Sequence, residues 1–418
     1  MPSIKPFKAI IYNKKKIKNI ARVVAPPYDV ISPVMQDELY KKHPNNVVRL
    51  ILGKINNTDD EADNRYTRAA KSFNDWLNAG VLIPDKKESI YIYSQGYKHD
   101  GKYTERPGFI SLMELELSGS KKVLPHENTL KAPKADRLKL TRSVKANLSP
   151  IFLLYEDDKN KIGKILKAAM KSKPFIDINI DGVRNRVWAL SRSGGIEKII
   201  KYMSAKNTFI ADGHHRYETA RNYANETGSE ASKYTLAYFC KLDDDSLTVF
   251  PTHRIIKDIS ALNAADILAK LKKFFDIKEF SSINSCLAAL KALRKHHAFG
   301  MYLGGKSFYC LKLKKDGAAE PFMGTGSKDW KSLDVSILHL FVIQNILAIR
   351  DEDDNIEFVK DAADAVKAVA EDSFKIAFLL NPTKVLQVKS VAEHGEKMPR
   401  KATFFYPKPL SGLVIRKI

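Results

Sequence analysis

The sequence is poor in cysteine and has no long apolar run. Its 418 residues include only three cysteines, Cys240, Cys286 and Cys310. No two of them stand in a CxxC spacing, so neither a disulfide framework nor a zinc site built on cysteine pairs is expected. A run of eighteen apolar residues does not occur, and the opening MPSIKPFKAI lacks the apolar core of a secretory signal. We therefore expect a cytoplasmic protein with buried thiols and no membrane association.

Several motifs of nucleotide and metal chemistry are missing as well. One string, GMYLGGKS at residues 300–307, fits the spacing GxxxxGKS. It falls within a stretch expected as a strand pair, whereas a P-loop leads from a strand into a helix, so a P-loop fold is not expected. Gly324-Thr325-Gly326 lacks the third glycine and the preceding strand of a dinucleotide-binding fingerprint. No HExxH pair indicates a zinc site. The helices expected after Phe250 also lack the short glycine turn and clustered arginines of a helix-turn-helix. Any nucleotide site must therefore be built from another motif.

The charge balance is strongly basic, with a net charge of +22. Such a surplus favours anionic partners through long-range attraction. The lysines are spread over the whole chain and do not form one block with aromatic residues between them, so nucleic acid is not expected as a partner. A hydrophobic content of 44% and this length suffice for two or three domains with cores of their own.

The most informative stretch is residues 208–220, which read TFIADGHHRYETA. Three β-favouring residues lead into Asp212 and Gly213, and a helical pattern follows, so the stretch predicts a strand, a tight turn and a helix. Gly213 allows a backbone geometry closed to other residues and a close approach to a ligand. The amides of the first helical turn point outward with the positive end of the helix dipole. The turn is therefore a candidate anion-binding site.

The side chains of this turn suit phosphate chemistry. Asp212 could hold a divalent cation, and Arg216 could hold phosphate oxygens with its planar guanidinium. His214 and His215 could bind phosphate or move protons. The alternative is an ordinary turn with its histidines on a solvated helix start. Five adjacent groups with this chemistry favour a functional site.

The string DGHHRYETA resembles the phosphate-binding box of the ParB/sulfiredoxin-like superfamily, and most closely the DGxHR box of its free-serine kinases. A second resemblance runs from about residue 25 to the C-terminus. The strings IADGHHRYETA, APPYDVIS, LPHENT, ANLSPIFLLYED and MPRKATFFYPKPLSGLVI are similar to those of the family of unknown function called DUF1015. Together the resemblances imply a ParB/sulfiredoxin-like core that carries insertions.

Leu124-Pro125-His126-Glu127 resembles the first box of the same superfamily. In its serine kinases the glutamate of that box is the expected catalytic base, which the resemblance carries over to Glu127, with His126 orienting it. The expected order of strand, PHE, helix, strand, helix, strand, DGxHR and helix matches the core of the superfamily. Residues 156–207 are an insertion longer than that core predicts.

The expected organisation is an α+β protein with mixed sheets, in three parts. An N-terminal α+β unit spans residues 1–117, and the ParB/sulfiredoxin-like core spans residues 118–257 with the insertion 156–207. A C-terminal α/β unit spans residues 258–418. Its last stretch of about thirty residues is basic and punctuated by proline and glycine, which indicates either a solvated tail or a lid over the phosphate site. The matching family string favours the lid.

Hydrophobic periodicity predicts the remaining elements. Residues 46–52 are expected as a buried strand in which Arg49 needs an anionic partner, a carboxylate or a ligand. Arg137, on a cationic helix expected at residues 135–146, is a further candidate for phosphate binding. The other expected helices are residues 59–80, two within 261–297, 333–349 and 361–371, and the expected strands are 89–97 paired with 106–117, 150–155, 233–243 paired with 246–250, a pair within 299–313, 356–359 and 375–380.

These motifs predict a nucleotide-dependent small-molecule kinase. The resemblance to the DGxHR free-serine kinases implies free L-serine as the acceptor, O-phosphoserine as the product, and ATP or ADP with Mg²⁺ as the cofactors. The hypothesis divides the candidate residues into three roles: catalytic for Glu127, His126 and His214; nucleotide or phosphate binding for Gly213, His215, Arg216, Arg49 and Arg137; and metal binding for Asp212.

Two alternatives from other classes stay open at this point. One is a ParB-like nucleotide-binding switch without metabolic kinase activity, and the other is a metal-dependent phosphohydrolase that uses scattered histidines such as His126 and His253. The sequence also leaves open which of ATP, ADP and CTP is used, and whether the chain forms a homo-oligomer.

Overall fold

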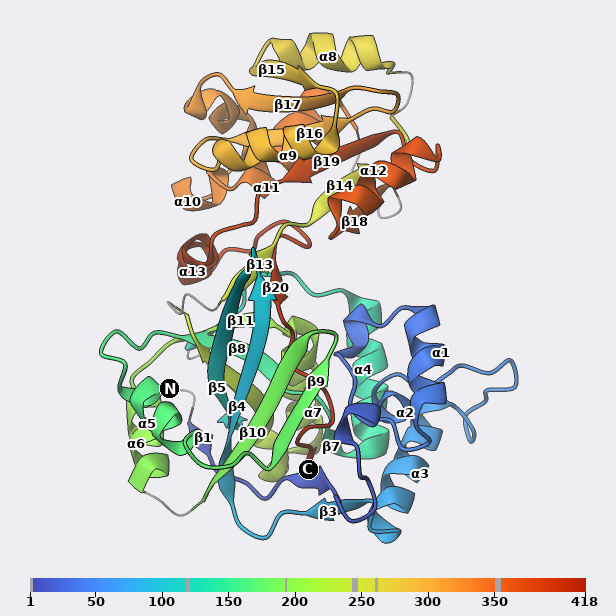
Figure 1. The fold of residues 1–418 in the computed structure, drawn as a ribbon, viewed down its shortest axis with the longest axis vertical. Coiled ribbons are helices and arrows are strands. Elements are labelled where there is room, and N and C mark those ends of the chain that lie inside the picture. Colours follow the sequence, from blue (N-terminus) through green and yellow to red (C-terminus); the bar gives the residue numbers. More distant parts are fainter. Residues whose placement is uncertain (1–2, 118–120, 192–193, 243–246, 260–261, 350–354) are drawn as a thin grey trace. The chain divides into compact units, whose positions relative to one another are not determined.

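The computed structural model describes residues 3–117, 121–191, 194–242, 247–259, 262–349 and 355–418. These residues form two compact units, each with a sheet of its own (Figure 1). The units combine helices with mixed or antiparallel sheets, so the expected α+β class is confirmed. The first unit consists of Met1–Pro125, Thr129–Thr248 and Pro407–Ile418, and the second consists of His126–Asn128 and Val249–Tyr406.

A nine-stranded mixed sheet forms the centre of the first unit. Its strands are β1 (Ile4–Lys5), β4 (Ser89–His99), β5 (Lys102–Glu114), β6 (Val123–Leu124), β8 (Ile151–Tyr155), β9 (Ile176–Ile180), β10 (Val183–Ser191), β11 (Thr208–Asp212) and β12 (Tyr234–Lys241). They follow the order β6-β11-β8-β12-β5-β4-β10-β9, and β1 pairs with β5 outside this path. β11 runs parallel to β6, and β8 runs parallel to β12, while the other neighbours are antiparallel.

Two small pairs complete the strands of this unit. They are β2 (Ile10–Tyr12) with β3 (Leu82–Pro84), and β7 (Ala146–Asn147) with β21 (Arg416–Lys417).

The hairpin of β4 and β5 joins residues 1–117 to the rest of the first unit. The sequence predicts these two strands, and the structure confirms them, with Asp100 and Gly101 at positive φ in the turn. The second edge of β5 pairs with β12, and the second edge of β4 pairs with β10. The boundary expected at residue 117 therefore falls inside one compact unit. The division of the chain into the three expected units stays a prediction.

The insertion of residues 156–207 extends this same sheet. Its two strands, β10 and β9, add to β4 and end the sheet on that side. Its two helices, α5 (Lys161–Ala169) and α6 (Gly194–Met203), contribute buried side chains to one apolar cluster with the sheet and with α7 (His214–Thr227). The insertion is therefore part of the core that supports the DGHHR turn.

The other helices of the first unit are α1 (Pro33–Lys42), α2 (Val48–Ile51), α3 (Arg65–Asn78) and α4 (Lys131–Val144), with short 3₁₀ turns at Ile20–Arg22, Tyr28–Val30 and Ala231–Lys233. The helix expected at residues 135–146 is confirmed as α4, which packs against both α3 and α7. The helix expected at residues 59–80 begins later, at Arg65. Asn64 starts it there because its side chain accepts from the Thr67 amide while the Thr67 side chain accepts from the Asn64 amide.

The strand expected at residues 46–52 is wrong, because this stretch contains helix α2. Asn46 shapes its start: the side-chain oxygen accepts from the Val48 amide at 2.9 Å, and the side-chain nitrogen donates to the Arg22 carbonyl at 2.8 Å. The apolar residues of α2 are all buried. A short apolar run that is buried all round carries no periodicity to separate a helix from a strand.

Arg49 of α2 contacts Tyr40 in place of the anionic partner that we expected. Its guanidinium carbon lies 4.2 Å from the centroid of the Tyr40 ring, and Nη2 donates to the Tyr40 carbonyl at 3.0 Å. The Arg49 Nε is buried and has no hydrogen-bond partner among the described atoms. Binding of phosphate by Arg49 stays a prediction.

The strand pair expected from residues 233–243 and 246–250 is also wrong. β12 pairs with β5 and β8, whereas β13 (Thr248–Phe250) pairs with β20 (Phe404–Tyr406). A partner strand so far away in the chain leaves no local trace in the sequence, whereas a hairpin does. The acidic turn expected between the two strands lies at residues 243–246, outside the described residues.

A six-stranded antiparallel sheet forms the centre of the second unit, in the order β15-β17-β16-β19-β14-β18. Apart from residues 333–349, the expected helices and strands of this region are confirmed, and β14 and β15 are additional strands. The strands are β14 (His253–Ile256), β15 (Phe275–Phe280), β16 (Ala298–Tyr302), β17 (Phe308–Leu313), β18 (Ile356–Val359) and β19 (Ile376–Leu380). The helices are α8 (Ala264–Lys272), α9 (Ile283–Ala292), α10 (Lys328–Lys331), α11 (Asp334–Ser336), α12 (Ala362–Ala370) and α13 (Val385–Glu393), with a 3₁₀ stretch at Asp316–Phe322.

Residues 333–349, expected as one helix, form α11 followed by a π-helix at Ile337–Ile346. The helical spacing of this stretch predicts four core-facing residues, of which Val335, Leu338 and Val342 are buried and Ile346 is half-buried.

Residues 407–418 pack into the first unit. Ile10 and Ile415 exchange two backbone hydrogen bonds, of 2.8 and 3.0 Å, and residues 413–415 are buried. This stretch is therefore core and not a solvated tail. Among the described helices, none is both long and apolar enough to cross a membrane.

Candidate phosphate-binding site

The strand, turn and helix predicted at residues 208–220 are confirmed. β11 ends at Asp212, and the first backbone hydrogen bond of α7 runs from the Tyr217 amide to the Gly213 carbonyl at 2.9 Å. Gly213 has a φ of 94° and a ψ of 29°, a left-handed conformation that other residues rarely adopt. Because glycine is the N-cap residue, α7 begins without the side-chain cap that Ser, Thr, Asp or Asn would supply. A helix start of this kind favours an external anion.

The guanidinium of Arg216 lies against Gly213. A Cβ atom built on Gly213 would lie only 2.9 Å from Arg216 Cζ and 2.9 Å from its Nη2. Nη2 donates to Asp212, and Nη1 donates to the carbonyl of Pro150. Arg216 Nε is buried and has no hydrogen-bond partner among the described atoms. Two nitrogens of this guanidinium are therefore held by the protein, and the third can still donate.

Asp212 also accepts from Lys408, which the sequence placed only in the basic C-terminal segment. Lys408 Nζ donates to the second oxygen of Asp212 and to Asp29 Oδ2, the latter at 2.5 Å. The side chains of Lys408 and Asp212 are 10% and 12% exposed. Burial by itself lowers the pKa of Lys408, but the carboxylates of Asp212 and Asp29 raise this pKa above its ordinary value. The ammonium therefore stays charged.

A second cationic group is centred on Arg137, which lies over the ring of Tyr28. The guanidinium carbon of Arg137 lies 4.1 Å from the centroid of the Tyr28 ring, and its Nη1 donates to the Ile51 carbonyl at 2.6 Å. Arg137 Nε donates to Asp136 at 2.7 Å, and Arg65 donates to the same carboxylate. Burial by itself raises the pKa of Asp136, but Arg137 and the other donors hold this pKa below its ordinary value. Asp136 is therefore an ionised counter-ion for both arginines.

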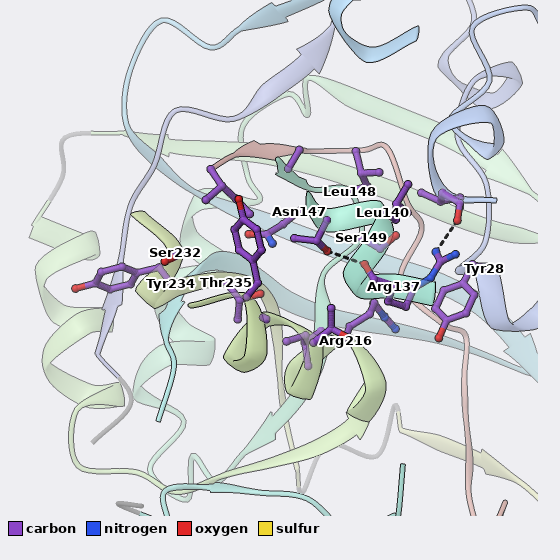
Figure 2. Close-up of a pocket in the computed structure, with 18 residues that line it drawn as sticks. Tyr28, Arg137, Leu140, Asn147, Leu148, Ser149, Arg216, Ser232, Tyr234 and Thr235 are labelled. Atoms are coloured by element: carbon purple, nitrogen blue, oxygen red, sulfur yellow. Dashed lines mark hydrogen bonds between the residues drawn. The ribbon is translucent and has the colours of Figure 1, made fainter. Parts of the chain in front are cut away.

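Arg137 and Arg216 line one cavity of the first unit, with a volume of about 60 Å³ (Figure 2). Figure 2 shows Tyr28 and Arg137 at one side of the cavity and Tyr234 at the opposite side. Thr219 Oγ1, from another lining residue, is buried without a hydrogen-bond partner among the described atoms. A water molecule needs roughly 10–15 Å³ by this measure. The cavity therefore has room for a few waters or a small charged group, but not for a whole nucleotide.

The two histidines of the turn begin α7. His214 is buried. His215 Nε2 accepts a hydrogen bond from the Leu130 amide at 3.0 Å, so Nδ1 carries the proton in the neutral ring. One helical turn further on, Glu218 accepts from the Thr129 hydroxyl at 2.6 Å. The start of α7 is therefore tied to the segment that leads into α4.

His126 and Glu127 belong to the second unit. His126 is fully buried, its Nε2 lies 3.0 Å from the Thr403 hydroxyl, and its carbonyl accepts from the Met398 amide at 2.8 Å. Glu127 is half-buried. These contacts anchor His126 to the chain near its C-terminus. The placement of Glu127 relative to the DGHHR turn stays a prediction.

The structure therefore brings part of the predicted set together. Asp212, Gly213 and Arg216 form one contact group, and Arg137 shares a cavity with Arg216. Arg49 does not line that cavity. Within the described parts of the chain, no group of three or more His, Cys, Asp or Glu residues could hold a metal ion.

The fold and this turn define a class of protein: an α+β protein in which a glycine turn and an arginine stand at the start of a helix beside a mixed sheet. The chain belongs to the DUF1015 family, described as a protein of unknown function, whose model matches residues 4–336. This match confirms the family resemblance of the sequence strings. The last of those strings, MPRKATFFYPKPLSGLVI, lies beyond the matched range.

Several solved structures resemble the chain at low identity. A free serine kinase variant in complex with AMP has 14% identity and a TM-score of 0.36, and the match covers 71% of this chain and 87% of that one. SbnI with a C-terminal truncation, from Staphylococcus aureus, has 10% identity and a TM-score of 0.35, with 72% and 85% covered. A conserved hypothetical protein from Pyrococcus furiosus has 15% identity and a TM-score of 0.35, with 72% and 92% covered. No curated protein sequence matches the chain. At these TM-scores the likeness assigns no residue roles.

Proposed function

We propose that the chain is a nucleotide-dependent small-molecule kinase. The observation that carries the proposal is the arrangement of the DGHHR turn. The start of α7, a glycine at positive φ and the guanidinium of Arg216 lie together, and Arg216 Nε can still donate. Helix starts and arginine guanidinium groups are both well suited to bind phosphate. Membership of a family of unknown function adds no activity, so the chemistry rests on this turn.

In this proposal the DGHHR turn binds the phosphates of the nucleotide. The backbone at Gly213, the amides of the first turn of α7, His215 and Arg216 would hold the phosphates of ATP or ADP. Arg137 and Arg49 would add positive charge nearby. Phosphoryl transfer depends mainly on positioning and on stabilising negative charge, which fixed cations and amides supply.

The acceptor side would use the PHE box. The hydroxyl oxygen of the acceptor attacks the terminal phosphorus, the bond to the leaving nucleotide breaks, and the hydroxyl proton passes to Glu127. His126 would orient Glu127, and its own ring is held at Thr403. His214 would stabilise the charge that develops on the transferred group.

Free L-serine is the acceptor that we propose, with O-phosphoserine as the product. This choice of acceptor rests on the resemblance of the DGHHR box to the DGxHR box of free-serine kinases. Each transfer would use the single hydroxyl group of one serine molecule. A pool of hydroxyl metabolites that includes L-serine lets the product itself identify the acceptor.

Mg²⁺ would enter this reaction on the phosphate oxygens of the nucleotide, where the ion commonly binds and keeps several of its waters. Asp212 is the only carboxylate of the DGHHR turn, but its two oxygens accept from Arg216 and from Lys408. Asp212 therefore does not fit a resident Mg²⁺, and no step of the proposed reaction passes through one.

Product analysis separates the kinase from the other candidate functions. The full chain would be incubated with Mg²⁺, ATP or ADP, and a pool of hydroxyl metabolites that includes L-serine, and the products would be identified by mass spectrometry. A kinase gives a phosphorylated acceptor and one equivalent of ADP from ATP, or of AMP from ADP. A phosphohydrolase gives inorganic phosphate alone, and a ParB-like switch binds nucleotide without either product. Absence of a phosphorylated acceptor from every pool would contradict the proposal.

A further inference from the structure

Lys408 occupies the place at Asp212 where a divalent cation would bind. A carboxylate that holds Mg²⁺ must turn at least one oxygen toward the metal, and the metal requires oxygen ligands on all sides. At Asp212 one oxygen accepts from Arg216 and the other accepts from Lys408. The neighbouring carboxylate, Asp29, also accepts from Lys408, at 2.5 Å. The acidic oxygens of this site are therefore already matched with cations of the chain itself.

Lys408 is held in this position by the backbone on both sides of it. The carbonyl of Pro407 accepts from the buried Arg106, and the carbonyl of Lys408 accepts from Gln95 Nε2 at 3.1 Å. The Leu410 amide donates to the Tyr93 hydroxyl at 3.4 Å. These partners lie on β4 and β5, in the middle of the nine-stranded sheet. The ammonium is therefore a built part of the first unit and does not reach Asp212 by chance from a loose chain end.

The charges of the contact group cancel. Asp29 and Asp212 supply two negative charges, and Lys408 and Arg216 supply two positive ones. Removing the ammonium would leave one uncompensated negative charge next to the start of α7, where it would repel a phosphate. It would also leave two carboxylates facing each other, which is a typical arrangement for binding a divalent cation.

We propose that Lys408 is the resident cation of the phosphate-binding turn, in the place that a divalent metal ion would otherwise take between Asp29 and Asp212. Lys408 donates to Asp212, and Asp212 accepts from Arg216, so Lys408 also fixes the carboxylate that orients Arg216. Lys408 is in this sense a positioning residue, and the turn is ready to bind a phosphate group without a metal of its own. Phosphate as the ligand rests on the proposed function, whereas the exclusion of the metal rests on the ion pairs.

Direct binding of Mn²⁺, followed by electron paramagnetic resonance of the free ion, tests the metal part. The unchanged full-length chain and Asp212→Asn should bind the same amount of Mn²⁺, because Asp212 holds no metal ion in the unchanged chain. Lys408→Met should gain one site, and the double variant Lys408→Met with Asp212→Asn should lose it again. Lys417→Met, which removes an exposed lysine of the same C-terminal segment, should behave as the unchanged chain does.

Two results would overturn the proposal. One is an Mn²⁺ site in the unchanged chain that Asp212→Asn removes, and the other is a folded Lys408→Met variant that gains no site. If Lys408→Met does not fold, the comparison of the unchanged chain with Asp212→Asn still decides the first point. Lys408→Arg keeps the charge and should fold, also without an Mn²⁺ site.

Titration with ADP tests the positioning role separately. In the presence of EDTA, Lys408→Met should bind ADP at least about tenfold more weakly than the unchanged chain, since a charged contact group is left incomplete. Mn²⁺ should restore much of this loss in Lys408→Met, and the gain should exceed any change that Mn²⁺ causes in Lys417→Met by binding the phosphates of ADP. ADP affinity equal to that of the unchanged chain in EDTA would overturn the positioning role. If the unchanged chain does not bind ADP at all, the proposed function fails. The Mn²⁺ measurement would still decide whether Lys408 excludes a metal ion from Asp212.

Discussion

Arg216 shows how the contacts of one side chain limit what can replace it. Its guanidinium donates to Asp212 and to the Pro150 carbonyl, and its buried Nε has no hydrogen-bond partner among the described atoms. A lysine at this position has one nitrogen on a flexible stem and cannot satisfy two acceptors of the protein while it binds a phosphate. At the scale of the single residue, geometry therefore matters more than charge.

Arg216→Lys should weaken the binding of ATP or ADP by about tenfold or more, which corresponds to roughly 1–3 kcal/mol for a charge-assisted contact. Isothermal titration calorimetry measures the change. Arg142→Lys is a matched control, because Arg142 forms a surface ion pair with Glu226 and is half exposed. An unchanged nucleotide titration in Arg216→Lys would place Arg216 outside the site.

The two ends of α7 offer a matched pair of glycines. Gly213 and Gly228 both have positive φ, of 94° and 59°, but only Gly213 has a side chain close to the position of a Cβ. Gly228→Ala should cost about 1 kcal/mol of unfolding free energy, from backbone strain alone. Gly213→Ala should cost about 2–3 kcal/mol, because the methyl group also displaces Arg216.

Urea unfolding and ADP titration together check this pair. Gly213→Ala should also lose nucleotide affinity, whereas Gly228→Ala should keep it. If Gly213→Ala and Gly228→Ala lose the same stability and bind ADP with the same affinity, the contact between Gly213 and Arg216 does not contribute to nucleotide binding.

At the scale of the element, a single buried histidine makes the second sheet sensitive to pH. His253 of β14 accepts a hydrogen bond at Nδ1 from the Leu380 amide, at 3.2 Å. Burial, assisted by the neighbouring Arg254, lowers the pKa of His253 to about 4. In the unfolded chain the pKa is that of an ordinary histidine, about 6.5. Between these two values the unfolded state binds the proton and the folded state does not.

The stability of the second unit should therefore decrease as the pH falls from about 6.5 to about 4, with a contribution of His253 of about 3 kcal/mol over that window. Above pH 6.5 this contribution is fully present. Thermal unfolding at a series of pH values measures it, and His253→Asn, which keeps an acceptor near the Leu380 amide, should have a flatter profile. Profiles of the same slope for both proteins would contradict the assignment.

The C-terminal segment divides into two stretches with different expected behaviour. Residues 407–418 are packed into the first unit, whereas the lid hypothesis concerns the basic residues before them. If those residues act as a lid, protease cleavage between Glu393 and Lys408 should slow when nucleotide is added, because contacts to phosphate order the chain. Limited proteolysis followed by mass spectrometry locates the cuts. Equal cleavage with and without nucleotide would exclude a lid.

At the scale of the whole molecule, the proposed reaction needs groups from both compact units. The DGHHR turn belongs to the first unit, and Glu127 belongs to the second. In-line transfer requires the base, the acceptor oxygen, the phosphorus and the leaving group to fall roughly on a line. The proposal therefore predicts that Glu127 is needed for turnover and not for nucleotide binding.

Glu127→Gln keeps the size of the side chain and removes the proton acceptor. Turnover should fall by about a hundredfold or more, while nucleotide affinity stays nearly the same. Steady-state kinetics and calorimetry separate the two quantities, and Glu226→Gln, at a surface ion pair, is a suitable control. A fully active Glu127→Gln variant would remove the base assignment.

The sequence by itself determined the α+β class, the family and the strand, turn and helix around Gly213. All of these depend on local patterns: alternating strands, helical spacing and a glycine where the chain must turn. The same local reasoning failed at residues 46–52, because an apolar run that is buried all round looks alike in a strand and in a helix. The helical conformation of α2 depends on its surroundings, because the contacts of Asn46 shape the start of the helix.

Only the tertiary structure decided which groups surround Asp212. Lys408 is 196 residues away along the chain, and Asp29 comes from the opposite end. Lys408 stands between two prolines, and Asp29 follows Pro27 by two residues, which indicates a fixed direction for each side chain but not the partner. Their meeting depends on β4 and β5, whose buried side chains hold the backbone at residues 407–410. Contacts of this kind arise when distant segments close on one core, so spacing in the sequence could not reveal that a lysine stands where a metal ion was expected.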